Sequence, residues 1–401
     1  MKRWVVILLV LLAVIVLVSP GIVGRLAEQN LQTSIDWAAS ENDTIAVTEQ
    51  KFDRRWFTSE GRYRIEFRNG RLQASVADPG SPGPHNFPAL IVATHIDHGL
   101  IPVTSLSRDA GSLKPGLASA VSTLQFDPGN GELIEIPGKV LSQVGLSGET
   151  VSQLLLEAGS LDNESIQAQW SGADVTVATD PTDLSMRFEG TIEPVSIATQ
   201  DKLVRVQKMR FKGEQVQTEY GFGVGSIECA VEAIAFGEPD ADGPVIGRLI
   251  LQANSAIDGD RVNGRTVMNF DDIAMPGFGD VDMALDIVVN RLDARSSQTV
   301  TQALQEMQDT DGPDAALADL YPRIAPALQS LLAAGAEIRI DRFDVVLPQG
   351  TVTSKARFDL PETDKAKFSW PALLLALTAS ADVRVPATLM EMAQATHPQA
   401  D

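Results

Sequence analysis

Two of the four histidines of the chain lie three residues apart in the segment IVATHIDHGLIPV (91–103), with Asp97 between His95 and His98. Residues of these types could do two kinds of chemistry. A pair of imidazoles can bind a metal ion, and an imidazole beside a carboxylate can act as a general base. The alternative is that the segment is structural and carries no chemistry.

The element that carries these side chains decides between the alternatives. Branched residues at both ends of the run and the Gly and Pro that follow it predict a β-strand. Successive side chains of a strand point to opposite faces, so His95 and Asp97 share one face and His98 points to the other. This geometry disfavours a two-histidine metal site, and the only other histidines are His85 and His397.

Pairing of His95 with Asp97 would need a nucleophile to become catalytic, and the chain has no G-x-S-x-G motif. We therefore assign no catalytic residue, no metal and no cofactor. His95, Asp97 and His98 are kept as candidate contacts to a ligand or partner. Trp56 and Phe57, near the first predicted hairpin, are further candidates, although such an aromatic pair packs more often into a core.

The elements around these residues follow a period of two. Tyr63, Ile65 and Phe67 alternate with charged residues before Asn69-Gly70, a dipeptide typical of tight hairpin turns. Similar runs recur, and polar turn sequences such as DGDRVNG (258–264) and LPQG (347–350) separate them. The recurring runs are 184–190, 203–211, 281–289 and 351–360. The pattern predicts a mainly β (α+β) fold with a large curled antiparallel sheet that has one apolar face.

A few helices are expected to cover this sheet. They are predicted over 291–309, over 314–335 with an end at Gly335, and over about 386–396. The body spans 44–401, and its strand arrays before and after about residue 200 leave open two similar halves. The pattern is compatible with one sheet or with two.

Composition excludes some classes of function. The 401-residue chain has a net charge of −21, which argues against a nucleic-acid partner. The single cysteine, Cys229, excludes an internal disulfide bond, and its apolar surroundings indicate a small hydrophobic side chain rather than a reactive thiol.

The N-terminus predicts a membrane anchor. Every residue from Trp4 to Val18 is apolar, and the span to Val23 is long enough, at about 1.5 Å per residue, to cross a bilayer as a helix. We expect an anchor at 1–24 and a helical stalk at 25–43. Lys2 and Arg3 place the N-terminus in the cytoplasm and the body outside it. A cleaved signal peptide is the alternative, disfavoured because Pro20 would follow the best cleavage position, Ser19.

Several motifs follow one another in a characteristic order: the apolar span, Arg-Trp-Phe-Thr-Ser (55–59), the pair His98-Gly99, and LLAAGAEIRIDRFDVVLPQGTVTSKARFDL (331–360). In this order they resemble the YdgA-like bacterial family of envelope proteins of unknown function. Arg55 replaces the usual glycine of that family, and Leu100 replaces its usual proline. The resemblance implies an inner-membrane anchor, a periplasmic β-rich body and no assigned reaction.

A long sheet with one apolar face must cover that face by curling, with helices or with a bound molecule. We therefore expect a non-enzymatic envelope protein that binds lipid or another apolar ligand in a groove. The alternative is an interaction or assembly module that self-associates into a homo-oligomer or docks an envelope protein, for example through a strand edge.

Overall fold

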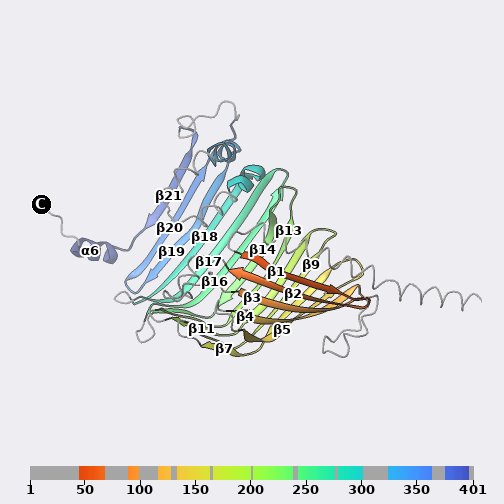
Figure 1. The fold of residues 1–401 in the computed structure, drawn as a ribbon. Helices are drawn as coiled ribbons and strands as arrows, with labels where there is room; N and C mark the ends of the chain where they lie inside the picture. Colours follow the sequence, from red (N-terminus) through yellow and green to blue (C-terminus); the bar gives the residue numbers. More distant parts are fainter. Residues whose placement is uncertain are drawn as a thin grey trace, which may run out of the picture. The chain divides into compact units, whose positions relative to one another are not determined.

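The computed structural model describes the chain in ten stretches, and β-strand predominates in all of them except the last, which ends in a helix (Figure 1). They cover residues 45–67, 89–98, 116–127, 133–162, 166–199, 202–237, 243–275, 279–300, 324–363 and 375–396. The chain divides into two compact units, residues 1–200 and 201–401. The prediction of a mainly β fold built on antiparallel sheet is confirmed.

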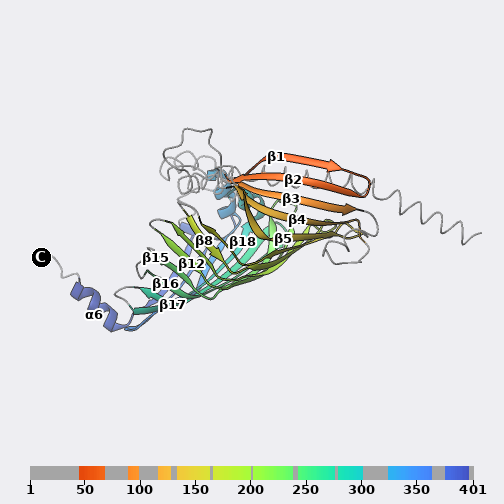
Figure 2. The same ribbon diagram turned by 60° about the horizontal axis from the view of Figure 1, so that its bottom comes forward.

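Unit 1 is built on eight strands, each paired antiparallel with its neighbours in the order β1-β2-β3-β4-β5-β6-β9-β10. Figure 2 shows β1 to β5 side by side. The strands are β1 (Ile45–Arg54), β2 (Thr58–Phe67), β3 (Ala89–His98), β4 (Ala118–Asp127), β5 (Ile134–Val144), β6 (Thr150–Leu156), β9 (Ala173–Asp180) and β10 (Ser185–Ile192). A smaller ribbon joins β8 (Ile166–Trp170) to β7 (Gly159–Asp162) and β11 (Val195–Thr199).

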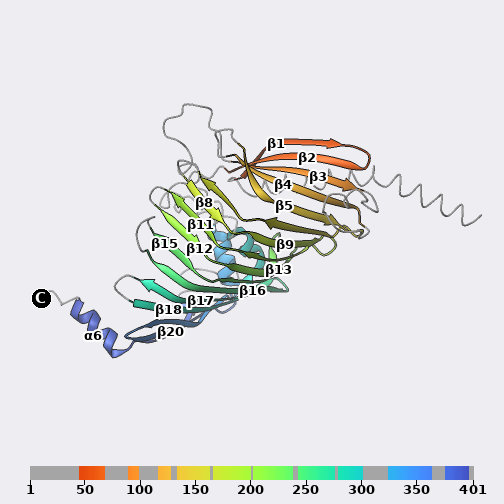
Figure 3. The ribbon, with the colours of Figure 1, turned by 90° about the horizontal axis from the view of Figure 1, so that it is seen from below.

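Unit 2 is also built on eight strands that pair antiparallel with their neighbours, in the order β13-β14-β16-β17-β18-β19-β20-β21. Figure 3 shows β16, β17 and β18 next to one another. The strands are β13 (Met209–Gln217), β14 (Gly223–Val231), β16 (Val245–Asp258), β17 (Arg261–Met275), β18 (Gly279–Asp293), β19 (Glu337–Leu347), β20 (Gly350–Asp359) and β21 (Thr378–Arg384). The short strand β15 (Ile234–Gly237) pairs with β12 (Leu203–Val206) and with the start of β16.

The two turns predicted at 258–264 and 347–350 are present at these positions in the structure. Asp258 pairs with Arg261 across a two-residue turn in which Gly259 has a φ of 61°, a conformation that glycine adopts at little cost. Leu347 pairs with Gly350 in the same way. Of the helix predicted over 314–335, the part before residue 324 lies outside the described residues, and residues 324–333 are helical. The turn after this helix ends at Gly335, whose φ is 83° and whose N–H donates to the Leu332 carbonyl. Helix α6 (Ala387–Thr396) matches the predicted last helix.

Two predicted elements differ in the structure. The run 203–211 is not one strand, because Gln207 and Lys208 leave the ladder and bond to Ala233 and Glu232. The prediction of a helix over 291–309 is wrong at its start, because β18 continues to Asp293 and the described helical residues are 294–300. The Asn69-Gly70 turn, the anchor at 1–24 and the stalk at 25–43 lie outside the described residues. Within the described part of the chain, no helix combines the length and apolar character needed to cross a membrane.

Candidate functional site

The histidine segment forms β3, and its side chains alternate as predicted. His95 and Asp97 share a face, with 3.4 Å between His95 Nε2 and Asp97 Oδ1. His98 lies on the opposite face, where its Nε2 is 3.0 Å from the Ser59 hydroxyl of β2. The predicted division of the two histidines between faces is therefore confirmed.

The Ser59–His98 contact is a serine–histidine pair that sequence reasoning missed. A hydroxyl beside an imidazole is the arrangement of an activated nucleophile. Here, however, Ser59 is 1% and His98 3% exposed, so both side chains are buried. The His98 N–H also donates to the Phe57 carbonyl at 2.9 Å. These bonds fasten the end of β3 to the start of β2, and their burial favours a structural role.

Both residues of this pair lie in motifs that the sequence analysis singled out, although the sequence did not show that they are in contact. Ser59 ends the Arg-Trp-Phe-Thr-Ser segment and His98 opens the His-Gly pair, two of the four motifs that carried the family resemblance. Only the register of β2 against β3, in which Ser59 is opposite Ile96, shows that the two motifs meet.

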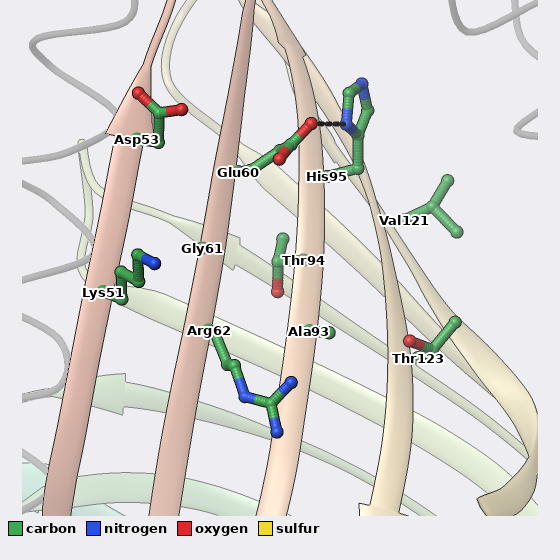
Figure 4. A pocket seen from close by; sticks show the side chains of 10 residues that line it. All are labelled: Lys51, Asp53, Glu60, Gly61, Arg62, Ala93, Thr94, His95, Val121 and Thr123. Atoms are coloured by element: carbon green, nitrogen blue, oxygen red, sulfur yellow. Dashed lines mark ion pairs between the residues drawn. The ribbon is translucent and has the colours of Figure 1, made fainter.

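The other face of β1 to β4 contains an open groove of about 530 Å³ (Figure 4). Its charged lining comes from alternate positions of three adjacent strands: Lys51 and Asp53 of β1, Glu60 and Arg62 of β2, and His95 of β3. Ala93, Val121 and Thr123 add small side chains. His95 thus belongs to a groove, whereas His98 does not.

Strand register arranges the groove charges in two rows. Asp53, Glu60 and His95 face one another across β1, β2 and β3, and His95 Nδ1 is 3.9 Å from Glu60 Oε1. The next row places Lys51 directly opposite Arg62. The groove therefore has an acidic row beside a row of two cations. No group of three or more His, Cys, Asp or Glu side chains among the described residues could hold a metal ion.

Trp56 and Phe57 lie in the turn between β1 and β2, which the Arg55 N–H closes by donating to the Thr58 carbonyl at 2.8 Å. They are 57% and 47% exposed. This exposure does not match packing into a core, and both residues stay candidate contacts to a ligand or partner.

The sheet of unit 2 has one apolar face, formed by two cross-strand rows that we call the apolar rows. One runs Phe211, Cys229, Leu251, Met268, Leu285, Phe343 from β13 to β19. The other runs Met209, Val231, Leu249, Phe270, Met283, Val345, Val352 from β13 to β20. Every member of both rows is apolar, as the predicted apolar face requires.

These side chains are half-buried rather than buried. Val231, at 4% exposure, is the only member of the two rows that is fully buried. On the same face, Ile338 and Phe358 are directly opposite each other and each is 42% exposed. Side chains in the centre of a packed sheet are normally covered by a second layer. Half-burial is the result expected when a side chain is shielded by its lateral neighbours alone.

The opposite face of unit 2 is charged and paired. Lys212 lies 3.0 Å from Glu228, Arg342 lies 2.6 Å from Asp344, and Arg265 makes two hydrogen bonds to Asp286 at 2.9 and 2.6 Å. The bonds from Arg265 lower the pKa of Asp286. On the apolar face, burial raises the pKa of the Cys229 thiol and keeps it neutral, in agreement with its predicted role as a small hydrophobic residue.

Comparison with known proteins gives one match. The model of a family described as "Bacterial protein of unknown function (DUF945)" matches residues 1–400. No curated protein and no solved structure matches the chain.

Proposed function

Because the chain belongs to the DUF945 family of bacterial proteins of unknown function, we propose its function from its own surfaces: it binds the apolar chains of a lipid on the apolar rows of unit 2. The protein acts without catalysing a reaction. Within the family we propose that it is YdgA-like, on the strength of the Arg-Trp-Phe-Thr-Ser and His98-Gly99 motifs.

The observation that carries this proposal is the half-burial of a continuous apolar face. Thirteen apolar side chains in two adjacent rows remain partly exposed except for Val231, while the other face carries ion pairs such as Arg265–Asp286. Exposed apolar surface is unfavourable by roughly 25 cal/mol per Å², so a bound hydrocarbon chain would stabilise this face by covering it. An acyl chain suits a flat row because it needs no directional contacts.

The location that we propose makes lipid available. We propose a single-pass protein of the bacterial inner membrane, with the N-terminus in the cytoplasm and the body in the periplasm. The apolar span Trp4 to Val23 and the preceding Lys2 and Arg3 support this orientation. A reporter that is active only in the periplasm, fused after residue 401, tests it: activity is expected, and its absence would contradict the orientation.

Site-specific photocrosslinking of the full chain in living bacteria tests lipid binding. A photoreactive phenylalanine derivative replaces Leu251 in one variant and Gln252 in the other. These neighbours lie on the same strand and point to opposite faces, so they form a matched pair. In cells whose phospholipids carry radioactive phosphate, the Leu251 variant should acquire label after illumination, and the Gln252 variant should not.

Equal labelling of both variants, or of neither, contradicts lipid binding on the apolar rows. Crosslinking of Leu251 to a protein instead of a lipid favours the second candidate function, an interaction or assembly module.

One observation favours that second function. Strand β21 (Thr378–Arg384) pairs with β20 on one side, and all seven of its residues are exposed. An exposed edge strand can pair with a strand of another chain. Replacing Ala381 by proline would block such pairing, and loss of a crosslinked homodimer or heterocomplex in this variant, with β20 peptides unchanged in hydrogen exchange, would support it.

A further inference from the structure

Lys51 and Arg62 form a like-charged pair in a protein with a net charge of −21. They are direct cross-strand neighbours on β1 and β2, and both side chains line the groove of unit 1 (Figure 4). Like charges directly opposite each other in a sheet repel and destabilise the pairing. An anion bound between the two cations would remove this repulsion.

Neither cation has a compensating ion pair within the part of the chain that the structure describes. At one end of the face, Glu66 lies 3.3 Å and Asp127 lies 2.6 Å from Arg64, so both of these acids are paired with another cation. At the other end, Asp53 and Glu60 lie 3.5 and 3.9 Å from Arg55, and Glu60 also contacts His95. Lys51 and Arg62 form no ion pair of 4 Å or less with a described residue.

We propose that the Lys51–Arg62 pair binds a phosphate group. The ammonium supplies a point charge and the guanidinium a planar pair of donors, which together suit phosphate oxygens. Thr123 lines the same groove and offers a hydroxyl, and the small side chain of Ala93, opposite Arg62, leaves room above the sheet. The site is independent of the apolar rows of unit 2.

The adjacent acidic row narrows the ligand class. Asp53 lies two residues along β1 from Lys51, and Glu60 lies two residues along β2 from Arg62, a separation of about 7 Å in each case. A second phosphate at that position would be repelled, whereas an ammonium group would be attracted. The site therefore fits a single phosphate with an amine close to it, either a free aminoalkyl phosphate or the headgroup of a phospholipid.

Calorimetric titration of the purified full-length protein in nonionic detergent tests this site. Three probes are used: inorganic phosphate, O-phosphoethanolamine, and a short-chain phosphatidylethanolamine below its micelle concentration. We expect O-phosphoethanolamine to bind more tightly than inorganic phosphate by a factor of three or more. Lys51→Gln and Arg62→Gln should each weaken it at least tenfold.

Lys139→Gln is the matched control, because it removes one positive charge from β5 of the same unit, outside the groove lining. The Lys139→Gln variant should bind O-phosphoethanolamine with the same affinity as the native protein. Tighter binding of the short-chain lipid than of O-phosphoethanolamine assigns the site to a headgroup, and equal or weaker binding assigns it to a soluble ligand.

Absence of binding for all three probes, or equal weakening by Lys139→Gln, overturns the proposal. A second measurement, the melting temperature, distinguishes loss of the phosphate site from loss of the fold. Without ligand, Arg62→Gln relieves repulsion, so its melting temperature should equal or exceed that of the native protein, and a fall of several degrees would show that Arg62 has a structural role instead. Crosslinking at Leu251 is unaffected by either outcome.

Discussion

Replacement of Arg64 by alanine should destabilise the first four strands of unit 1 more than any exposed arginine does. Arg64 Nη1 lies 2.6 Å from Asp127 Oδ2, and the two side chains are only 18% and 6% exposed. Burial by itself would lower the pKa of the Arg64 guanidinium, but its hydrogen bonds to Asp127 and Glu66 raise it. The ion pair is therefore strong enough to offset the desolvation of the cation.

The path of this side chain explains two buried residues on a polar face. Arg64 belongs to β2 and Asp127 to β4, so the bond between them passes over β3. Ile91 is opposite Arg64 and Ala89 is opposite Asp127, and they are 3% and 0% exposed. Arg64 thus covers apolar surface with its stem while its head neutralises a buried carboxylate.

The loss in Arg64→Ala should be about 3 kcal/mol, the lower end of the range for stranding one partner of a buried ion pair, because Arg64 retains some exposure. Hydrogen exchange of β2–β4 peptides in the full chain measures this locally. A loss of about 3 kcal/mol corresponds to exchange roughly a hundredfold faster.

Arg187→Ala, on an exposed position of β10, is the control and should change these rates less than about threefold. Adding Asp127→Asn to Arg64→Ala removes the stranded charge and should restore part of the protection. If Arg64→Ala behaves like Arg187→Ala, or if Asp127→Asn gives no recovery, the buried ion pair does not stabilise these strands and the reasoning fails.

Three further predictions concern unit 2. Gly335→Ala should lower the free energy of unfolding in urea by about 1–3 kcal/mol, because residue 335 has a φ of 83° and a Cβ there would lie 2.9 Å from the Glu362 backbone nitrogen. Arg265 lowers the pKa of Asp286, so this bond contributes stability above the unfolded carboxyl pKa of about 3.9, and the contribution is lost as pH falls through the lower folded pKa. Arg265→Gln should therefore flatten the fall in melting temperature on acidification below about pH 4, and an unchanged slope would exclude this coupling. Leu251→Ala should cost about 1 kcal/mol or less rather than the roughly 2–5 kcal/mol of a packed core, and a larger loss would show that the apolar rows are packed internally.

The strands and tight turns of this protein could be predicted because their signals are local. Alternation with a period of two needs only neighbouring residues, and the runs at 281–289 and 351–360 became β18 and β20 with few changes. The alternation in the run 203–211 is imperfect, since a single strand would place Arg205 and Gln207 on the same side as Leu203 and Phe211. In the structure Leu203 and Arg205 stay together in β12, and the chain changes partners from β15 to β14 before Phe211 in β13.

The sites depend on register, which alternation alone does not determine. A bulge between Val47 and Glu49 inserts a residue into β1 and shifts every later side chain of that strand relative to β2. Without this shift Lys51 would not lie opposite Arg62, and the two cations would not share the groove. The exposure of Trp56 and Phe57 was also unpredictable, since a three-residue turn can fold over a sheet or project from it.

Register also keeps the two sides of β3 chemically separate. His98 and Ile96 point to the side where Ser59 is buried and where Ile96 packs with Ala118, whereas His95 points into the charged groove. A change at His95 or Arg62 therefore alters the groove without removing atoms from this core, and a change at His98 does the reverse. This is why a ligand site can lie on one face of a strand whose other face holds the fold together. The alternation of β3 thus places His95 and Asp97 on the groove face and His98 on the face of Ser59.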